Sequence, residues 1–499
     1  MSHLVIAPLL LPLCAGIVLL MLRHLDIRLR RALALTAVLA QIGVAVALTR
    51  AVADDAILTY ALGAWPAPYG IVLVADRLVA WMLLITTLLA LFPLWHASHG
   101  LDTRGRHFHV LYQLQLFGLS GAFLTGDVFN LFVFFEVLLL ASYGLVLHGG
   151  GGERTRAGLH YVVINLAGSS LFLIAVGTLY GLYGTLNMAD LARLMPATPA
   201  DNLGPARAAG LLLFAVFALK AALLPLYLWL PAAYASTSAP VAALFAIMTK
   251  VGAYAILRAS TLLFGAEAGG LAGLLDAWLL PLALATLVIG LLGVLAARHL
   301  REQAAYMVVA SVGTLLAAFA LGSHAGLAAG LYYLPHSTFA AAAMFLLAER
   351  IAAARGAQAD RFEVGPRMTG EYWLGALFFC AGILIAGLPP LSGFIGKFLI
   401  LQAALAHPAR AWILAVVLVG GLLALIALAR VGSLFFLRVD RHRDDSPALP
   451  VPVAPAVGLL LLGLGLTVAA GPVHDFAAQI AEQLLQPRLY IDAVLGGRP

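Results

Sequence analysis

Lysine is nearly absent from this sequence. The 499 residues include three lysines against 26 arginines. Charge of either sign is scarce as well, because only 10% of the residues are charged whereas 63% are hydrophobic. A water-soluble domain has roughly 25% charged and 45–50% apolar residues. The composition therefore excludes a soluble globular domain and indicates an integral membrane protein.

Cysteine is also scarce, and its placement excludes several kinds of site. Cys14 and Cys380 lie far apart in apolar runs and form no CxxC pair. A structural disulfide, a zinc site and an iron–sulfur cluster have no support in the sequence, so we predict no metal and no cofactor. The N-terminus lacks a basic start and a small-residue cleavage site, which predicts a spanning helix and not a removed signal peptide.

A nucleotide-binding loop is missing too. The stretch GLPPLSGFIGKF (387–398) ends in a glycine–lysine pair, but Leu391 occupies the position of the first glycine of a phosphate-binding loop. Phe398 follows the lysine where Ser or Thr is needed. The net charge of +6 comes from arginines in short loops, so no nucleic-acid partner is predicted either.

Apolar runs of about 20 residues set the organisation of the chain, because that length spans a bilayer. We count fourteen such runs, which predicts an all-α integral membrane protein with about 14 transmembrane helices. After the last run, apolar residues between Val473 and Leu485 recur at helical spacing, which predicts an interfacial amphipathic helix. The predicted spans are 3–22, 32–49, 72–95, 108–125, 128–147, 160–183, 208–230, 239–263, 273–296, 304–321, 326–349, 373–406, 411–436 and 451–471.

The placement of the arginines predicts the orientation of these helices. Seventeen of the 26 fall in the loops after odd-numbered spans, and six fall in the other loops and the C-terminal tail. Short loops rich in Arg remain in the cytoplasm. Both termini are therefore predicted to lie on the non-cytoplasmic side of a bacterial inner membrane.

All three lysines, in contrast, lie inside predicted spans. Lys220 and Lys250 fall near the midpoints of their spans, as does Glu136, and Lys397 lies within the 373–406 span. Each such charge costs roughly 2.5–3.5 kcal/mol if it is unpaired at the membrane centre. A lysine, unlike an arginine, readily loses its proton in a low-dielectric site. We expect these four groups to face the bundle interior and to carry protons.

A purely structural role is the alternative for each charge, because an intramembrane ion pair can simply hold helices together. The three lysines outnumber Glu136, so pairing with it cannot neutralise them all. At least one lysine is then expected to be neutral or bridged by water, which is the condition for passing on a proton. This count favours a proton path over a set of fixed ion pairs.

Prolines interrupt two of the spans that carry a lysine. Pro225 follows Lys220 by five residues, and Pro389 and Pro390 precede Lys397. Because proline blocks a helix, helices 7 and 12 are predicted to break at membrane depth, which requires a protein-enclosed or wet cavity. Interrupted helices in corresponding halves point to inverted repeats. The predicted divisions are 1–107 (helices 1–3), 108–263 (helices 4–8, the first repeat), 273–437 (helices 9–13, the second repeat) and 438–499 (helix 14 and the amphipathic helix).

Histidine and arginine add further candidates. His336 lies mid-helix beside Pro335, and an imidazole titrates near neutrality, so it suits a link between lysines of the two halves. A hydrogen bond to a neighbouring carbonyl is the alternative role for His336. His324, at the edge of the same helix, is expected on the surface. Arg77, near the start of helix 3, is expected to form a local pair or a subunit contact.

Four stretches of the sequence are distinctive: GDVFNLFVFFEVLLLASYGL, LKAALLPLYLWLPAAYASTSAPVAALFAIMTKVGAYAILR, LYYLPHSTFAAAAMFLLAE and AGLPPLSGFIGKF. Together they resemble the D subunit of the multi-subunit Mrp-type monovalent cation/proton antiporters. More broadly, they are similar to the antiporter-like, proton-translocating subunits of respiratory complex I and membrane-bound hydrogenases. The resemblance covers nearly the whole chain, from helix 3 through helix 13.

The resemblance implies fourteen helices, inverted five-helix repeats at helices 4–8 and 9–13, and broken helices 7 and 12. It also implies a proton path. Many relatives carry a lysine three or four residues after the helix 11 histidine, where this chain has Phe339 and Ala340, so this link is expected to depend on water. The implied members of the path are Glu136, Lys220, Lys250, His336 and Lys397.

The sequence thus predicts a secondary transporter subunit and not an enzyme. Glu136 and Lys220 are expected to form a switchable pair. The predicted partners are other membrane subunits of an antiporter complex, protons, a monovalent cation (Na⁺ or K⁺) and the lipid bilayer. The alternative is a proton-pumping subunit of a complex I-like NADH–quinone oxidoreductase or a membrane-bound hydrogenase. A scaffold subunit is a third possibility, against which the intramembrane lysines argue.

Overall fold

The computed structural model describes residues 2–438 and 451–496 as a bundle of helices with one small β-hairpin. The hairpin is antiparallel and pairs Leu58 with Ala75. Short 3₁₀ turns occupy 62–64, 101–103 (η2), 195–197, 269–271 and 356–358. The N-terminal elements are α1 (Ser2–Met21), α2 (Ile27–Ala51), β1 (Leu58–Ala61), β2 (Val72–Ala75) and α3 (Arg77–Ala97).

The stretch predicted as the first repeat contains one interrupted span. Its helix ends at Ala221, the backbone turns through Ala222 at a φ of 58°, and helix resumes at Trp229, with Pro225 inside the break. Its elements are α4 (Phe108–Leu124), α5 (Val128–Val146), α6 (Gly152–Tyr183), α7 (Met188–Leu194), α8 (Ala200–Ala221), α9 (Trp229–Ser236), α10 (Ala239–Phe245), α11 (Met248–Arg258) and the π-helical turn η4 (Ala259–Leu263).

The following stretch contains the second interruption. Helix ends at Ala386 and resumes at Ser392, and Pro389 and Pro390 lie between the two. The predicted breaks in helices 7 and 12 are therefore present. The elements are α12 (Asp276–Ala296), α13 (Leu300–Phe319), α14 (His324–Ala354), α15 (Glu371–Ala386), α16 (Ser392–Ala404), α17 (Arg410–Gly432) and the π-helical turn η7 (Ser433–Leu437).

The C-terminal part closes the bundle with α18 (Ala454–Val468), α19 (Ala470–Leu484) and α20 (Pro487–Leu495). A bend of 81° separates α18 from α19. The predicted amphipathic helix is α19, and its buried residues Ile480 and Leu484 lie on the face that packs against α14 and α3. Protein contacts therefore cover this apolar face, which the sequence alone assigned to the membrane interface.

The number of spanning helices differs from the prediction. Within the described ranges, eleven helices are long and apolar enough to cross a membrane, or twelve if the bent α18–α19 pair is counted. The all-α membrane fold is confirmed, but the count of fourteen is not. The difference arises because α4 has only 17 residues, α15 and α16 are separate short helices, and the last span bends after α18.

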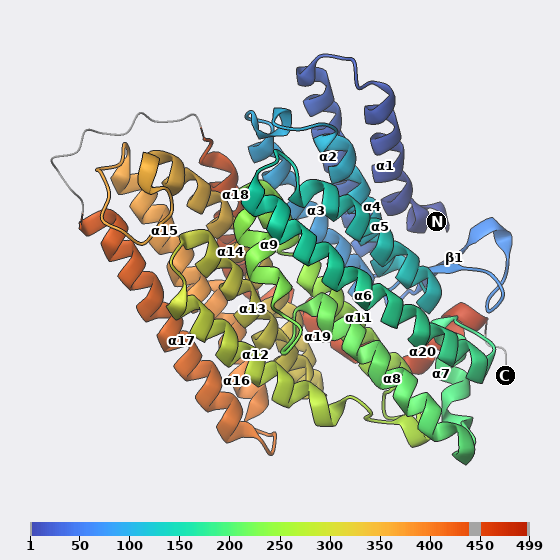
Figure 1. Cartoon of the computed structure of the whole chain (residues 1–499). Coiled ribbons are helices and arrows are strands. Elements are labelled where there is room, and N and C mark those ends of the chain that lie inside the picture. The colour runs from blue at the N-terminus through green and yellow to red at the C-terminus, as the bar shows by residue number, and fades with distance from the viewer. Residues whose placement is uncertain (1, 439–450, 497–499) are drawn as a thin grey trace.

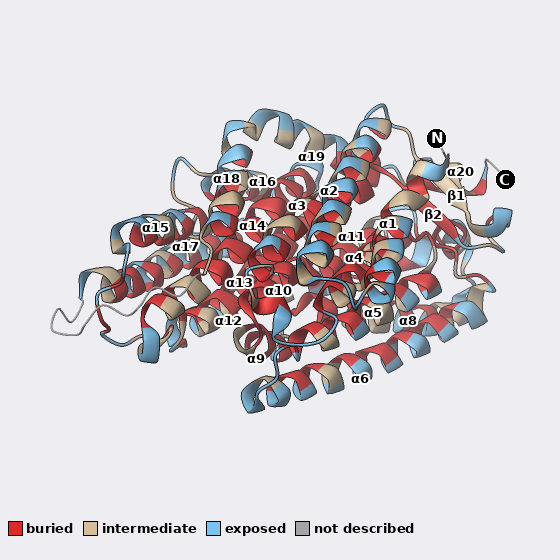
Figure 2. Ribbon diagram, turned by 90° about the horizontal axis from the view of Figure 1, so that it is seen from above, coloured by how far each residue is buried: buried red, intermediate tan, exposed pale blue. Residues whose placement is uncertain are grey.

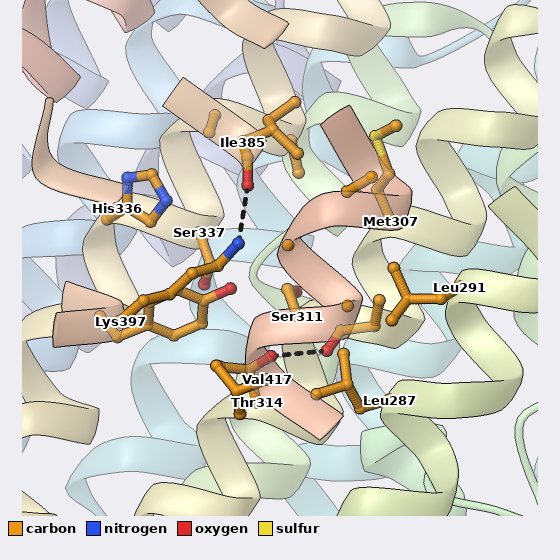
Figure 3. Close-up of a pocket in the computed structure, with 17 residues that line it drawn as sticks. Leu287, Leu291, Met307, Ser311, Thr314, His336, Ser337, Ile385, Lys397 and Val417 are labelled. Carbon is orange, nitrogen blue, oxygen red and sulfur yellow. Dashed lines mark hydrogen bonds between the residues drawn. The ribbon is translucent and has the colours of Figure 1, made fainter. Parts of the chain in front are cut away.

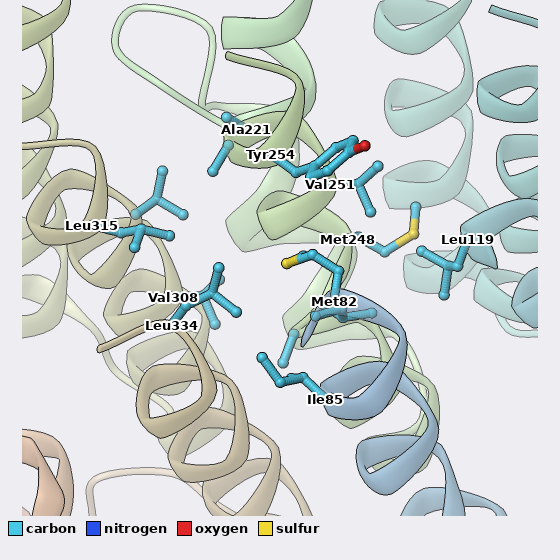
Figure 4. Close-up of a cluster of buried hydrophobic side chains, with 14 of the residues drawn as sticks. Met82, Ile85, Leu119, Ala221, Met248, Val251, Tyr254, Val308, Leu315 and Leu334 are labelled. Atoms are coloured by element: carbon cyan, nitrogen blue, oxygen red, sulfur yellow. The ribbon is translucent and has the colours of Figure 1, made fainter. Parts of the chain in front are cut away.

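The centre of the bundle is the span formed by α10, α11 and η4. Its most apolar 18-residue stretch, within Ala239–Leu263, is 100% buried by neighbouring elements. Figure 2 shows buried ribbon concentrated along α10, α11, α13 and α14, whereas α2 and α6 carry exposed stretches. Figure 4 shows Ala221, Val251 and Leu315 among the apolar side chains that gather around α11. Lys250 lies on this central helix.

The arginine-rich loops gather at one end of the molecule. In Figure 1 the connections after α1, α3 and α5 lie toward the top, and α16 is joined to α17 at the bottom. Spans that cross a membrane in alternating directions place their odd-numbered and even-numbered loops at opposite ends, as here. Three arginines used for the orientation prediction, Arg441, Arg443 and Arg498, lie outside the described residues.

A buried ion pair ties α3 to the central span. Asp76 lies 2.6 Å from the guanidinium of Arg258, and both side chains are buried. Asp76 also caps α3 by accepting a hydrogen bond from the backbone N–H of Val79 at 2.9 Å. Arg258 lies over the rings of Tyr254 and Tyr490, at 5.7 and 5.1 Å from their centroids. The C-terminal helix α20 is thereby tied to the same charge.

Replacing Asp76 by asparagine is expected to destabilise the protein by about 3–5 kcal/mol, because Asp76→Asn keeps the helix cap but leaves a buried guanidinium without its counter-charge. Thermal unfolding of the detergent-solubilised chain measures the effect. The matched control is Glu267→Gln, which removes an exposed pair with Arg488 at 3.1 Å and should cost less than about 1 kcal/mol. Equal effects of the two substitutions would contradict the role of Asp76 as the counter-charge of Arg258.

Candidate functional site

Glu136 and Lys220 are connected through two polar residues of α6. The hydroxyl of Ser169 donates a hydrogen bond to Glu136, and it also contacts the carbonyl of Asn165 at 3.0 Å. The side-chain oxygen of Asn165 accepts a hydrogen bond from Lys220 Nζ at 3.3 Å. Lys220 also lies 5.9 Å from the ring centroid of Phe135. The carboxylate and the ammonium thus share a polar chain across α6.

The expected direct pair between Glu136 and Lys220 is absent from the described structure. No ion pair joins them, because Glu136 bonds Ser169 and Lys220 bonds Asn165. Lys220 is 5% exposed, whereas Glu136 is only half-buried because α5 packs on α4 and α6 at the side of the bundle. Of the four charges expected to face the interior, Lys220 and Lys250 are buried, whereas Glu136 and Lys397 are each only half-buried.

Lys250 is buried completely on the central helix. Its Nζ donates to Ser311 Oγ of α13 at 3.2 Å, and the side chain is 0% exposed. The helix is irregular directly before it, between α10 and α11, so the Lys250 N–H bonds to the Ile247 carbonyl at 2.9 Å. Irregular turns inside a helix often mark places where the backbone moves. Lys250 thus follows an irregular turn of its helix and is bonded to α13.

Gly252 explains how the helices of Lys220 and Lys250 approach each other. A Cβ at this position would lie 2.3 Å from the Ala221 nitrogen and 2.7 Å from the Lys220 carbonyl carbon. Only glycine permits this contact between α11 and the end of α8. The approach is made by backbone, and no side-chain hydrogen bond joins Lys220 to Lys250 in the described structure.

His336, Ser311 and Lys397 border one cavity (Figure 3). It leaves about 50 Å³ for the centres of water molecules. One water needs at least ~10–15 Å³ measured in this way, so the cavity has room for several. Its polar lining also includes Thr314 of α13 and Ser337 of α14. The predicted dependence of the helix 11 link on water has the space that it requires.

His336 sits where the second broken helix begins. Its Nδ1 lies 3.1 Å from Ser392 Oγ, and the side chain is 1% exposed. A Cβ on Gly393 would lie 2.8 Å from His336 Cε1, so glycine is needed at this position for the close approach. The charges of both Lys250 and Lys397 act on the ring. His336 and Lys397 thus border the same cavity, which is also lined by Ser311, the partner of Lys250.

Lys397 reaches back across the break. Its Nζ donates to the carbonyls of Ala386 at 2.7 Å and Ile385 at 3.4 Å, at the end of α15. Figure 3 shows this ammonium pointing to the Ile385 carbonyl. The last carbonyls of a helix lack intrahelical donors and carry the negative end of its dipole. The break therefore creates a site for a cation, and the lysine fills it.

The first break is satisfied by different partners. Leu224 N–H donates to Thr286 Oγ1 of α12 at 2.8 Å, and the Trp229 indole donates to the Leu219 carbonyl at 3.0 Å. Lys220 lies in the last turn of α8, before its break, whereas Lys397 lies on the helix after its break. The two lysines are thus not in equivalent places, although the sequence shows a lysine and prolines close together in both spans.

Several polar residues of the site were not predicted. Asn165, Ser169 and Ser311 bind the charged groups, yet each is one small polar residue in an apolar run. The spacing of four between Asn165 and Ser169 is the signal that was available, because it places both on one face of a helix. Ser392, within GLPPLSGFIGKF, is likewise a single small polar residue, and its hydroxyl contacts His336.

His324 and Arg77, which lie outside the proposed path, make structural contacts. The imidazole of His324 is exposed and lies 3.0 Å from the carbonyl of Ala478 in α19, in agreement with the expected surface position. Arg77 pairs with Asp55 and not with its sequence neighbour, which is taken by Arg258. Arg77 therefore forms an ion pair, but its partner lies 22 positions away in the sequence and is not the adjacent Asp76. Within the described residues no group of three His, Cys, Asp or Glu side chains is placed to hold a metal ion.

Comparison with known proteins gives consistent results. Residues 125–424 match the family described as NADH:quinone oxidoreductase/Mrp antiporter, TM. The chain is 41% identical to the D subunit of a probable K(+)/H(+) antiporter of Rhizobium meliloti, over 99% of this chain and 98% of that protein. It is 36% identical to the D subunit of the Na(+)/H(+) antiporter of Alkalihalophilus pseudofirmus, over 99% and 100%. A chain in the structure of the Mrp complex from Dietzia sp. DQ12-45-1b has a TM-score of 0.88 at 28% identity and is matched over 99% of this chain and 100% of its own length.

Removing the hydroxyl that joins Glu136 to α6 is expected to slow proton transfer. Ser169→Ala should reduce dye-reported proton exchange about tenfold, which is the size of effect expected for a lost hydrogen bond to a charged group. The adjacent Ser170→Ala is the matched control, because Ser170 is exposed and bonds only the Leu166 carbonyl, at 3.2 Å. Equal exchange by the two variants would show that the polar contacts between Glu136 and Lys220 across α6 have no part in proton transfer.

Proposed function

The chain belongs to the NADH:quinone oxidoreductase/Mrp antiporter family of membrane proteins, and on this basis we propose that it is the proton-translocating, D-type component of a multi-subunit monovalent cation/proton antiporter. The names of the relatives supply the ions: K⁺ and H⁺ for one, Na⁺ and H⁺ for the other. The chain is a transporter subunit, and the proposed proton path consists of Glu136, Lys220, Lys250, His336 and Lys397.

One observation carries the proton path. The three lysines of the chain lie in spanning elements, and each ammonium is bonded to a neutral group: Asn165, Ser311 or the Ala386 carbonyl. None of the three is paired with a carboxylate within the described residues. A lysine that only stabilised the fold would be expected to have a counter-charge, because an unpaired ammonium in the membrane is costly. Neutral partners instead favour a group that gains and loses a proton.

The geometry supports a transfer in two parts. In the first, a proton on Lys220 strengthens the attraction to Glu136 through Ser169 and Asn165, and loss of the proton weakens it. In the second, Lys250 passes a proton through Ser311 to waters in the cavity that His336 and Lys397 border. Movement at the Gly252 contact would join the two parts, because it is the place where their helices touch.

The two predicted repeats, 108–263 and 273–437, are part of the proposal. Three features recur in both stretches in the same order. An isolated β-bridge precedes α5 in one and α13 in the other (Asp127 with Asn187, His299 with Arg361). A broken span follows, and the final span ends in a π-helical turn, η4 or η7. These shared features support the repeat, with 1–107 and 438–499 flanking it.

We also propose a bacterial inner membrane location with both termini on the non-cytoplasmic side. The distribution of arginines among the loops supports this orientation. Other membrane subunits are the proposed partners. A complex I-like or hydrogenase-like redox assembly is the second candidate, because the family description includes NADH:quinone oxidoreductase. The proteins that co-purify with the chain from its native membrane distinguish the two.

Glu136→Ala and Lys220→Ala are each expected to abolish coupled exchange while the chain still assembles with its partners. Each substitution removes one of the two charged groups that Ser169 and Asn165 of α6 connect. Membrane vesicles loaded with a pH-sensitive dye and challenged with Na⁺ or K⁺ report the exchange. Arg207→Ala on the same helix as Lys220 is the control and should exchange normally, since Arg207 is exposed. Wild-type rates in both test variants would refute the proton path.

Arginine in place of lysine separates a titrating group from a fixed charge. Lys397→Arg should lower exchange to near background, because the guanidinium keeps the charge and cannot lose its proton. Lys397 is the cleaner test site, since it borders a cavity, whereas Lys250 is packed on all sides. Lys250→Arg should fail as well, and thermal unfolding checks its packing. The reverse change Arg410→Lys, at an exposed site, is the control. Normal exchange by both arginine variants would mean that the lysines act as fixed charges.

A further inference from the structure

A second polar cavity lies far from the proton path, between the α1–α2 connection and the α3–α4 connection. Its volume is about 510 Å³, within the range of small-ligand sites. Both connections belong to the arginine-rich end of the molecule (Figure 1). One wall holds Arg23, His24 and Arg30, and the other holds Asp102, Arg106, His107 and His109. None of these residues takes part in the proposed transfer.

The single carboxylate of the cavity is already neutralised. Both oxygens of Asp102 accept hydrogen bonds from Arg31, at 2.7 Å each, and one also faces His109 Nε2 at 2.9 Å. Burial opposes ionisation of this carboxyl, but the bonds from Arg31 and His109 hold its pKa well below the usual range. The nearby Asp26 is engaged as the N-cap of α2. The three arginines of the lining therefore leave the cavity strongly positive.

Two polar atoms of the cavity lining lack partners. Arg30 Nε is a buried donor with no hydrogen-bond acceptor, and Nδ1 of His109, a side chain that is 95% buried, has no hydrogen-bond partner. The N-terminus of α4 opens at the same place, and its N-cap residue, His107, makes no capping bond. The N–H groups of the first turn of a helix bind anions, particularly phosphate. Arginine adds a planar fork that suits phosphate oxygens.

The surface beside the cavity is apolar. Met21, Leu25 and Leu29 are exposed next to it, at 73%, 38% and 50%. Further along the same two helices, Leu20 and Leu39 are exposed as well. The cationic cavity at the end of the spanning helices complements the anionic phosphate of a phospholipid. The apolar surface beside it complements the acyl chains. A free phosphate ion would use only the first.

We propose that this cavity binds the phosphate of an anionic phospholipid, whose acyl chains lie along α1 and α2. Arg30, Arg106 and the first turn of α4 hold the phosphate, and Arg23 faces it from the α1–α2 connection. Asp102 positions His109 and balances Arg31. The lipid site anchors the two N-terminal helices, which have the least buried surface of the spans at this end of the chain.

The test uses the full chain in nanodiscs of phosphatidylcholine with and without phosphatidylglycerol, and native mass spectrometry counts the phosphatidylglycerol retained after release into detergent. Arg30→Gln with Arg106→Gln should weaken binding about fivefold for each arginine removed. Arg156→Gln, an exposed arginine at the same end of the molecule, is the matched control and should bind normally. Arg106→Gln alone serves if the double variant fails to fold, because Arg106 is exposed.

Inorganic phosphate and a partner protein are the other occupants that the experiment separates. Failure of inorganic phosphate to displace the lipid supports the proposal. Binding of phosphate with the same arginine dependence, while phosphatidylglycerol is not retained, would assign the cavity to a free anion and overturn it. Loss of a partner protein from the purified complex, with lipid retention unchanged in Arg30→Gln with Arg106→Gln, would overturn it as well.

Discussion

The structure depends on one constraint, which is that Lys250 must be kept on a helix with no exposed face. The ammonium has no carboxylate partner within the described residues, and only the Ser311 hydroxyl receives its hydrogen bond. In a medium without water, such a group must be bonded, hydrated or neutral. The polar side of α13, the cavity beside it and the imidazole of His336 all lie where they meet this requirement.

The broken helices follow from the same requirement. A continuous helix uses its carbonyls internally and offers nothing to a cation at membrane depth. Ending α15 at Ala386 exposes two carbonyls, and Lys397 binds both. In the other half, the break after Lys220 is satisfied by Thr286 and Trp229, so the Lys220 ammonium is left to bond Asn165. Two breaks of similar sequence therefore have different roles. The carbonyls at the second break bind Lys397, whereas those at the first do not bind Lys220, which bonds Asn165 of α6 instead.

The polar residues form two groups that meet only through backbone. Glu136, Ser169, Asn165 and Lys220 make one group, and Lys250 begins the other, with the close contact at Gly252 between them. Such an arrangement suits a switch, because a small displacement of α11 against α8 changes the separation of two charges in a low-dielectric medium, where charges interact strongly. A continuous row of hydrogen bonds would conduct without control. The irregular turn before Lys250 provides a place for that displacement.

The sequence by itself determined the medium, the helical fold and the two breaks, and it singled out the five titratable residues of the proposed path. Each follows from local chemistry: hydrophobic runs of fixed length, prolines that block helices, and charges too costly to leave in a membrane without a purpose. Only the tertiary structure decided that Glu136 reaches Lys220 through α6, that Lys397 binds across its own break, and that several apolar runs do not form separate full-length spans. These features depend on which helix faces pack against each other. Asn165, Ser169 and Ser311 are ordinary residues in sequence, and they become partners of a charge only when packing places them beside it.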